Sequence, residues 1–191
     1  MIRNPHIRLG LMVLLAFSGS ASAQSLPASG SPERTKWIYP KIKDSGKVVR
    51  LPNAAEQPMD GSKIVVDITR KGDLQAVNPA IAKLARFVNL YAGAGKKAAT
   101  VDIVVVMHGN ATICSLDDSA YRRHSGVARN PNLPLFKKLK QVGVKVHVCG
   151  QALSHKQYGF AAVHEDVTVA VSALTAIVNQ QHKGYAYLPM H

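Results

Sequence analysis

One segment of the chain reads Val144-Lys145-Val146-His147-Val148-Cys149-Gly150-Gln151-Ala152-Leu153. Apolar and polar residues alternate up to Cys149, which is typical of a β-strand, and Gly150 then predicts a turn. A thiol at the end of a strand is a candidate reactive group, because strand ends lie where ligands reach the sheet. The second cysteine, Cys114, follows another strand, which ends in His108-Gly109-Asn110. We therefore expect the two thiols and the histidine to share one site, which would suit sulfur, redox or soft-metal chemistry.

The residues around this segment predict an α/β domain, because short apolar runs alternate with amphipathic stretches from Lys63 onward. Strands are expected over residues 64–68, 101–107, 144–149, 167–171 and 185–188, and helices over 79–93, 111–124, 135–142, 154–162 and 173–183. We predict one three-layer domain over residues 62–191, with a five-stranded, mostly parallel sheet in a flavodoxin-like strand order. Parallel sheets bind ligands beyond the carboxyl ends of their strands, so His108, Asn110 and Cys149 should converge at that edge.

The N-terminus has the pattern of a secretory signal peptide over residues 1–23. Arg3 and Arg8 precede the apolar run at 9–17, and Ala21-Ser22-Ala23 supplies the small residues of a cleavage site. The apolar run is much shorter than the ~20 residues of a membrane-spanning helix. We expect a mature protein that is exported to the periplasm and that has no membrane partner after cleavage.

Export leaves two states open for the cysteines. In an oxidising compartment an even number of cysteines is normally read as paired, and a Cys114–Cys149 disulfide would stabilise the fold by about 3–4 kcal/mol. The alternative is a free, reactive Cys149.

The charge and the motifs of the chain exclude several functions. The formal net charge of +13 falls to +11 when Arg3 and Arg8 leave with the signal peptide. The remaining basic residues are scattered, aromatic residues are few and no nucleic-acid-binding module is present, so we expect a solvated basic surface and no nucleic-acid partner. No Gly-x-Ser-x-Gly elbow and no glycine-rich nucleotide motif occurs, so a hydrolase is not favoured and no cofactor is expected.

Residues 24–61 form a separate zone that predicts an extended arm. It is rich in proline, at Pro27, Pro32, Pro40, Pro52 and Pro58, and too poor in apolar residues to build a core of its own. Its apolar cluster Trp37-Ile38-Tyr39 predicts the place where the arm docks, on its own domain or on a neighbouring subunit.

Three runs of the domain resemble the DsrE/DsrF-like family over about residues 62–188. They are Val105-Val106-Met107-His108-Gly109-Asn110, the run from Gly143 to Leu153 around Cys149, and Gly184-Tyr185-Ala186-Tyr187. The resemblance implies a persulfide on Cys149, a homotrimer or homohexamer, and a sulfur donor or acceptor, protein or small molecule, as partner. It implies a carrier rather than a turnover enzyme. Supporting residues would be Cys114, His108, Asn110, Gly150, Gln151 and His147.

This chemistry is physically reasonable at the position of Cys149. A thiolate attacks a sulfane sulfur, and backbone N–H groups at the start of the following helix favour the negative charge. Gly150 would allow a close approach of the backbone. His147 shares a face with Cys149 if the strand continues that far.

Two binding functions remain as alternatives. A soft metal ion would suit ligands drawn from His108, Cys114, His147, Cys149 and His155. A small anion would suit the sheet edge near Arg70, Lys71 and Asn110.

Overall fold

The computed structural model describes residues 36–190, which belong to one compact unit. The predicted signal peptide and the first part of the predicted arm lie outside the described residues. Within residues 36–190 no helix is both long and apolar enough to cross a bilayer.

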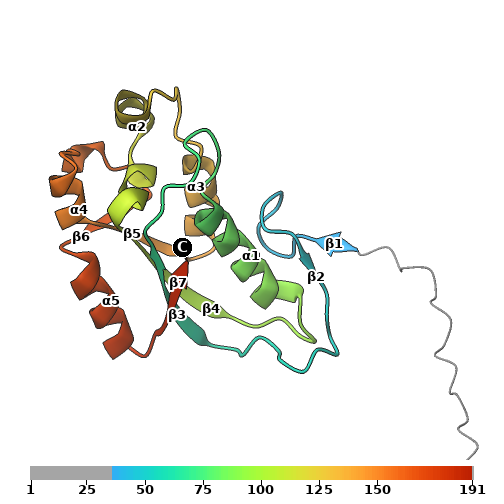
Figure 1. Cartoon of the computed structure of the whole chain (residues 1–191). Coiled ribbons are helices and arrows are strands. Elements are labelled where there is room, and N and C mark those ends of the chain that lie inside the picture. Colours follow the sequence, from blue (N-terminus) through green and yellow to red (C-terminus); the bar gives the residue numbers. More distant parts are fainter. Residues whose placement is uncertain (1–35, 191) are drawn as a thin grey trace, which may run out of the picture. The chain divides into compact units, whose positions relative to one another are not determined.

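The domain is built on a five-stranded, fully parallel sheet, which confirms the predicted α/β class (Figure 1). The strands are β3 (Ser62–Ile68), β4 (Val101–Met107), β5 (Lys145–Cys149), β6 (Thr168–Ala170) and β7 (Ala186–Met190). Their order is β6-β5-β4-β3-β7, with every neighbouring pair parallel.

This order differs from the flavodoxin-like order, in which the first strand of the sheet lies between the second and the third. Here the chain steps in one direction from β3 to β6 and then returns across the whole sheet to place β7 beside β3. Because parallel crossovers are right-handed, successive steps in one direction place their helices on one face, and the return places its helix on the other. Figure 1 shows this separation, with α1 (Pro79–Gly93) and α3 (Leu133–Gln141) on one side of the sheet and α5 (Ala173–His182) on the other.

The two faces of the sheet pack into two apolar clusters. Alternate strand residues, such as Val66, Val105 and Val148, pack with α1 and α3. The intervening residues Val65 and Val106 pack with Cys149 and α5. The period of two along each strand therefore decides on which face a side chain lies.

Helix α1 begins as the sequence predicts, because the Asn78 side chain accepts a hydrogen bond of 2.9 Å from the N–H of Ala80. The helix predicted over 111–124 is wrong in its extent. The chain forms a 3₁₀ helix, η1 (Gly109–Ser115), and then α2 (Asp118–Ser125), separated by an extended Leu116 that bridges to Val163. This bridge to a distant segment interrupts the helix.

The helix predicted over 154–162 is also displaced. Helix α4 (Gly150–His155) starts directly after β5, and the 3₁₀ helix η2 (Phe160–Ala162) follows separately. Gln157 between them has a φ of 56°, which a helix cannot accommodate. The start of α4 therefore lies against the end of β5, where Cys149 is the N-cap.

The described part of the arm forms a hairpin of β1 (Trp37–Ile38) and β2 (Val48–Val49) that docks on α1 of the same chain. Ile42 and Val48 are each only 2% exposed, whereas Trp37 is 50% exposed. Docking of the Trp-Ile-Tyr cluster on a neighbouring subunit stays a prediction, but within one chain this cluster does not anchor the arm. The buried amide of Asn89 in α1 holds the arm instead, through its backbone at residues 41–46.

Candidate functional site

Cys149 is the last residue of β5 and the N-cap of α4. Its Sγ accepts a hydrogen bond from the N–H of Ala152 at 3.4 Å, and the residue is 5% exposed. Helix α5 begins at the same edge of the sheet, and its first residue, Ala173, packs in the same cluster as Cys149. The sulfur is therefore held at the start of α4 and beside the beginning of α5, at the carboxyl edge of the sheet.

Gly150 allows α4 to lie directly against the edge strand β6. A Cβ at this position would stand 3.0 Å from the carbonyl oxygen of Ala170 and 3.3 Å from that of Val171. The close backbone approach expected of Gly150 is thus present, and it determines where the Cys149 sulfur sits.

His147 lies on the same face as Cys149, because β5 continues without interruption to Cys149. Burial lowers the pKa of His147, and the nearby charges of Lys145 and Lys183 lower it further. Its imidazole is therefore neutral at pH 7.

His108 is held by a carboxylate that belongs to a different strand. Its Nε2 lies 2.8 Å from Oδ1 of Asp67 in β3, and the second carboxylate oxygen, Oδ2, accepts a 2.7 Å hydrogen bond from the hydroxyl of Tyr187 in β7. Asp67 is 6% exposed, whereas the His108 side chain is 32% exposed. The hydrogen bond to Asp67 is the main cause that raises the pKa of Tyr187.

The register of the strands places His108 beside Cys149. Val106 pairs with His147, and Met107 pairs with Val148. One residue further along, the backbone of His108 is still extended and reaches the level of Cys149 on the same face. The structure therefore brings His108 and Cys149 to one edge of the sheet, as the sequence predicts.

Cys114 lies elsewhere. It is fully buried in η1 and packs in the cluster on the opposite face of the sheet from Cys149, and both cysteines are free. Burial raises the pKa of the Cys114 thiol to about 11, so the thiol is neutral at physiological pH. The expectation of a site shared by both thiols is wrong, and the two sulfurs do not form the alternative disulfide.

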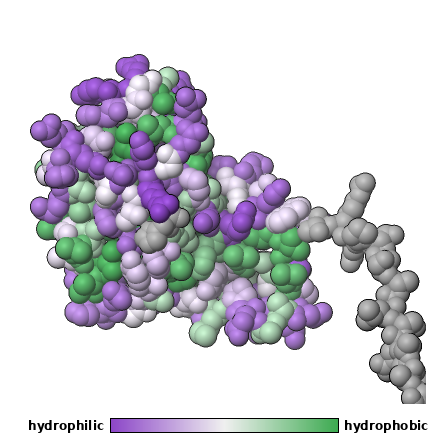
Figure 2. Space-filling model, in the orientation of Figure 1, coloured by the Kyte–Doolittle hydropathy of each residue, from purple (hydrophilic) through white to green (hydrophobic). Residues whose placement is uncertain are grey.

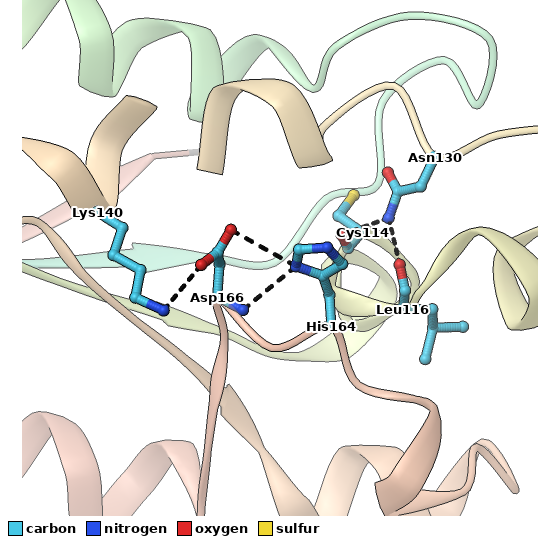
Figure 3. A network of polar contacts seen from close by, with 6 residues as sticks. All are labelled: Cys114, Leu116, Asn130, Lys140, His164 and Asp166. Carbon is cyan, nitrogen blue, oxygen red and sulfur yellow. Dashed lines mark hydrogen bonds and ion pairs between the residues drawn. The ribbon is translucent and has the colours of Figure 1, made fainter. Parts of the chain in front are cut away.

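A polar network around Cys114 has a structural role (Figure 3). The Asn130 side chain donates to the carbonyl oxygens of Cys114 and Leu116 at 2.8 and 2.7 Å. Beside it, Asp166 accepts from Lys140 at 2.8 Å and lies 3.8 Å from His164. The Asn130 bonds fix the segment between β4 and α2, and they satisfy carbonyl groups that would otherwise be buried without partners.

Asn110 and Gln151 are exposed residues of the carboxyl edge. The Asn110 Oδ1 accepts a 3.1 Å hydrogen bond from Lys156 of α4, which brings a cation to this edge. Gln151 makes a long, 3.5 Å contact with the carbonyl oxygen of Val171. Neither residue has a contact with Cys149 that would assign it a chemical role.

The binding alternatives receive no support from this geometry. Across residues 36–190, no group of three or more His, Cys, Asp or Glu side chains lies close enough together to hold a metal ion. Cys114, one of the five expected ligands, packs on the opposite face of the sheet from the Cys149 cluster. Arg70 and Lys71 are exposed, and the contacts of this segment with the rest of the fold run through its backbone carbonyls.

The Asp67–His108–Tyr187 contact does not follow from the sequence patterns. A signal was present in the pattern: Asp67 is the one acidic residue in an otherwise apolar strand end, Ile64-Val65-Val66-Asp67-Ile68. Its partners lie 41 and 120 residues further along the chain, so only the strand order brings them together.

Comparison with known proteins agrees with this fold. The model of the DsrE/DsrF-like family matches residues 63–190, about two thirds of the chain, and the protein belongs to this family. Among solved structures, it is similar to the protein of unknown function MTH1491 from Methanobacterium thermoautotrophicum, with a TM-score of 0.50 and 21% sequence identity over 68% of this chain and 99% of that one. At this identity the likeness shows the fold alone. Comparison with curated proteins gives no match.

Proposed function

We propose that this protein is an exported sulfur carrier that holds sulfane sulfur as a persulfide on Cys149. The DsrE/DsrF-like family is associated with sulfur relay. The observation that supports the proposal most strongly is the Cys149 sulfur itself, which caps α4 and accepts the N–H of Ala152 at the carboxyl edge of the sheet. That hydrogen bond holds the sulfur at this edge, and the thiolate is the form of cysteine that attacks a sulfane sulfur.

The small exposure of Cys149 restricts the donor. At 5% exposure, a flat protein surface cannot reach the thiol directly. A terminal sulfur on a narrow chain, such as a polysulfide or the end of a persulfide, fits this access. Once formed, the persulfide would place its outer sulfur farther from the Cys149 backbone and so nearer to an acceptor.

The partner and the compartment are part of the proposal. A signal peptide over residues 1–23 would direct the mature chain to the periplasm, where the donor or acceptor would be a small sulfur compound or another exported protein. Separating periplasmic and cytoplasmic fractions, with the mass of the recovered chain, tests cleavage after Ala23.

We further propose that the carrier is a homotrimer or a homohexamer. Figure 2 shows a hydrophobic area of the surface in the region of α5. The exposed apolar side chains there and on the adjoining segment include Val171 at 77%, Leu174 at 78% and Val178 at 48%. An apolar patch of this kind marks an interaction surface. Leu174→Lys should lower the mass measured by light scattering to that of a monomer, whereas an unchanged mass would place the interface elsewhere.

The test of sulfur carriage is the intact mass of the protein before and after incubation with polysulfide. We expect a gain of about 32 Da, one sulfur atom, in the wild type and in Cys114→Ser, and no gain in Cys149→Ser. Cys114→Ser is the matched control, since it makes the same substitution at the buried thiol. An equal gain in Cys149→Ser would refute carriage on this residue.

A further inference from the structure

Asp67 is a buried carboxylate that is paired through both of its oxygens. It lies in the central region of the sheet at 6% exposure, where a charge is costly unless it is paired. Its two oxygens accept hydrogen bonds from His108 and from Tyr187, which is itself 44% exposed. His108 lies at the carboxyl edge, whereas Tyr187 lies further back along the sheet at the level of Val65, so Asp67 links the body of the sheet to His108.

The hydrogen bonds determine which nitrogen of His108 is free. An ionised carboxylate only accepts, so the Nε2 facing Asp67 at 2.8 Å carries a proton. In the neutral imidazole the other nitrogen, Nδ1, then has its lone pair available to accept a proton. Tyr187 donates to the second oxygen of Asp67 and so orients this carboxylate. The oriented carboxylate in turn holds the His108 ring.

The position of this pair relative to Cys149 follows from the strand register. His108 follows the last paired residue of β4, Met107, and Cys149 follows its partner in β5, Val148. Neighbouring strands lie about 4.8 Å apart, and residues at the same level on the same face are adjacent. The backbone positions of His108 and Cys149 are therefore adjacent at the carboxyl edge, on the α5 face of the sheet, and Asp67 lies on the other side of β4 from Cys149.

From this juxtaposition we infer that His108 is the proton acceptor for the Cys149 thiol in sulfur transfer, and that Asp67, held by Tyr187, positions it. The inference rests on the proposed function and deepens it. His108 Nδ1 takes the proton of Cys149, and the thiolate attacks the outer sulfur of a donor persulfide, R–S–SH. The Cys149 S–S bond forms as the donor S–S bond breaks, and the leaving thiolate R–S⁻ takes up the proton from His108. No net oxidation or reduction occurs.

The experiment measures the rate at which iodoacetamide alkylates Cys149 at pH 7, localised to this cysteine by peptide mass. His108→Gln removes the base and should lower the rate by about 10-fold to 100-fold. His124→Gln makes the same substitution at an exposed histidine in α2 and should leave the rate unchanged. A rate in His108→Gln within twofold of the wild type would overturn the inference.

Positioning by Asp67 is tested by the tautomer of His108 in ¹⁵N spectra. The wild type should show the Nε2–H tautomer, and Asp67→Asn should show a mixture together with a reduced alkylation rate. Tyr187→Phe removes only one hydroxyl, so it provides a milder variant with a smaller effect in the same direction. An Nδ1–H tautomer in the wild type would contradict the assignment.

The same variants separate this inference from the proposed function. If the wild type gains sulfur from polysulfide and His108→Gln gains it at the same rate, sulfur carriage on Cys149 is supported and the proton-accepting role of His108 is refuted. If no variant gains sulfur but His108→Gln still slows alkylation, His108 activates the thiol for a different reaction.

Discussion

The attachment of the arm depends on one buried side chain, Asn89 of α1, and its replacement by alanine gives a result that can be calculated. The Asn89 oxygen accepts from the N–H groups of Lys41 and Ile42 at 2.9 and 2.8 Å. Its nitrogen donates to the carbonyl oxygens of Ile42, Ser45 and Gly46 at 3.1, 2.9 and 3.0 Å. A typical hydrogen bond contributes about 0.5–1.5 kcal/mol net; because the five bonds share one side chain, we take the lower part of this range, about 0.6–0.8 kcal/mol each, so their loss should cost about 3–4 kcal/mol.

This cost falls on the docking of the arm, because its backbone regains hydrogen bonds to water when the arm opens. Since each 1.4 kcal/mol changes an equilibrium tenfold, Asn89→Ala should increase the open population of the arm by about 100-fold to 1,000-fold. Limited trypsin digestion measures this population at Lys41, Lys43 and Lys47, and the fluorescence of Trp37, the single tryptophan of the chain, reports on the same segment.

The matched control is Asn179→Ala, the same substitution at an exposed helical position of α5. It should change stability by less than about 0.5 kcal/mol and leave the digestion of the arm unchanged. If Asn89→Ala and the wild type are cleaved at the same rate in the arm, the arm is held by contacts other than this amide, and the reasoning is refuted.

Two further predictions concern the residues around the thiols. Burial raises the pKa of Cys114 from 9.0 to about 11, so between these pH values the folded protein keeps a proton that the unfolded chain loses. The free energy of unfolding should therefore fall by up to about 2–3 kcal/mol as the pH rises through this window. Urea unfolding of Cys114→Ser at pH 8 and pH 11 should lack this part of the fall. Gly150→Ala forces a Cβ to within 3.0 Å of the Ala170 carbonyl oxygen, so it should destabilise by about 1–2 kcal/mol and slow sulfur loading. Gly159→Ala, which meets no atom within 4 Å, should do neither, and equal effects of the two glycine variants would contradict a fixed position for Cys149.

Local patterns in the sequence predict the elements of this fold well. Alternation identifies the strands, Asn78-Pro79 identifies the start of α1, and Gly150 identifies the end of β5, although a helix and not a turn begins there. Because parallel strands deliver their carboxyl ends to one edge, the placement of His108 and Cys149 at that edge follows from these elements, whereas their adjacency depends on the pairing of β4 with β5.

The remaining features depend on contacts between distant segments. The Leu116–Val163 bridge divides a predicted helix, and the return of β7 to the side of β3 brings Tyr187 to Asp67. Cys114 was placed at the wrong site because its segment turns into a 3₁₀ helix that packs on the opposite face from Cys149. No local pattern records on which face a segment after a strand will pack.

The most direct test of the central claim is whether sulfur held on Cys149 is passed on. Protein loaded with polysulfide and freed of excess donor is mixed with a small thiol acceptor, and its intact mass is followed with time. Carriage predicts that the added mass of about 32 Da disappears from Cys149 as an equal amount of persulfide forms on the acceptor. Loaded protein that keeps the sulfur, or loses it without forming acceptor persulfide, would contradict the account.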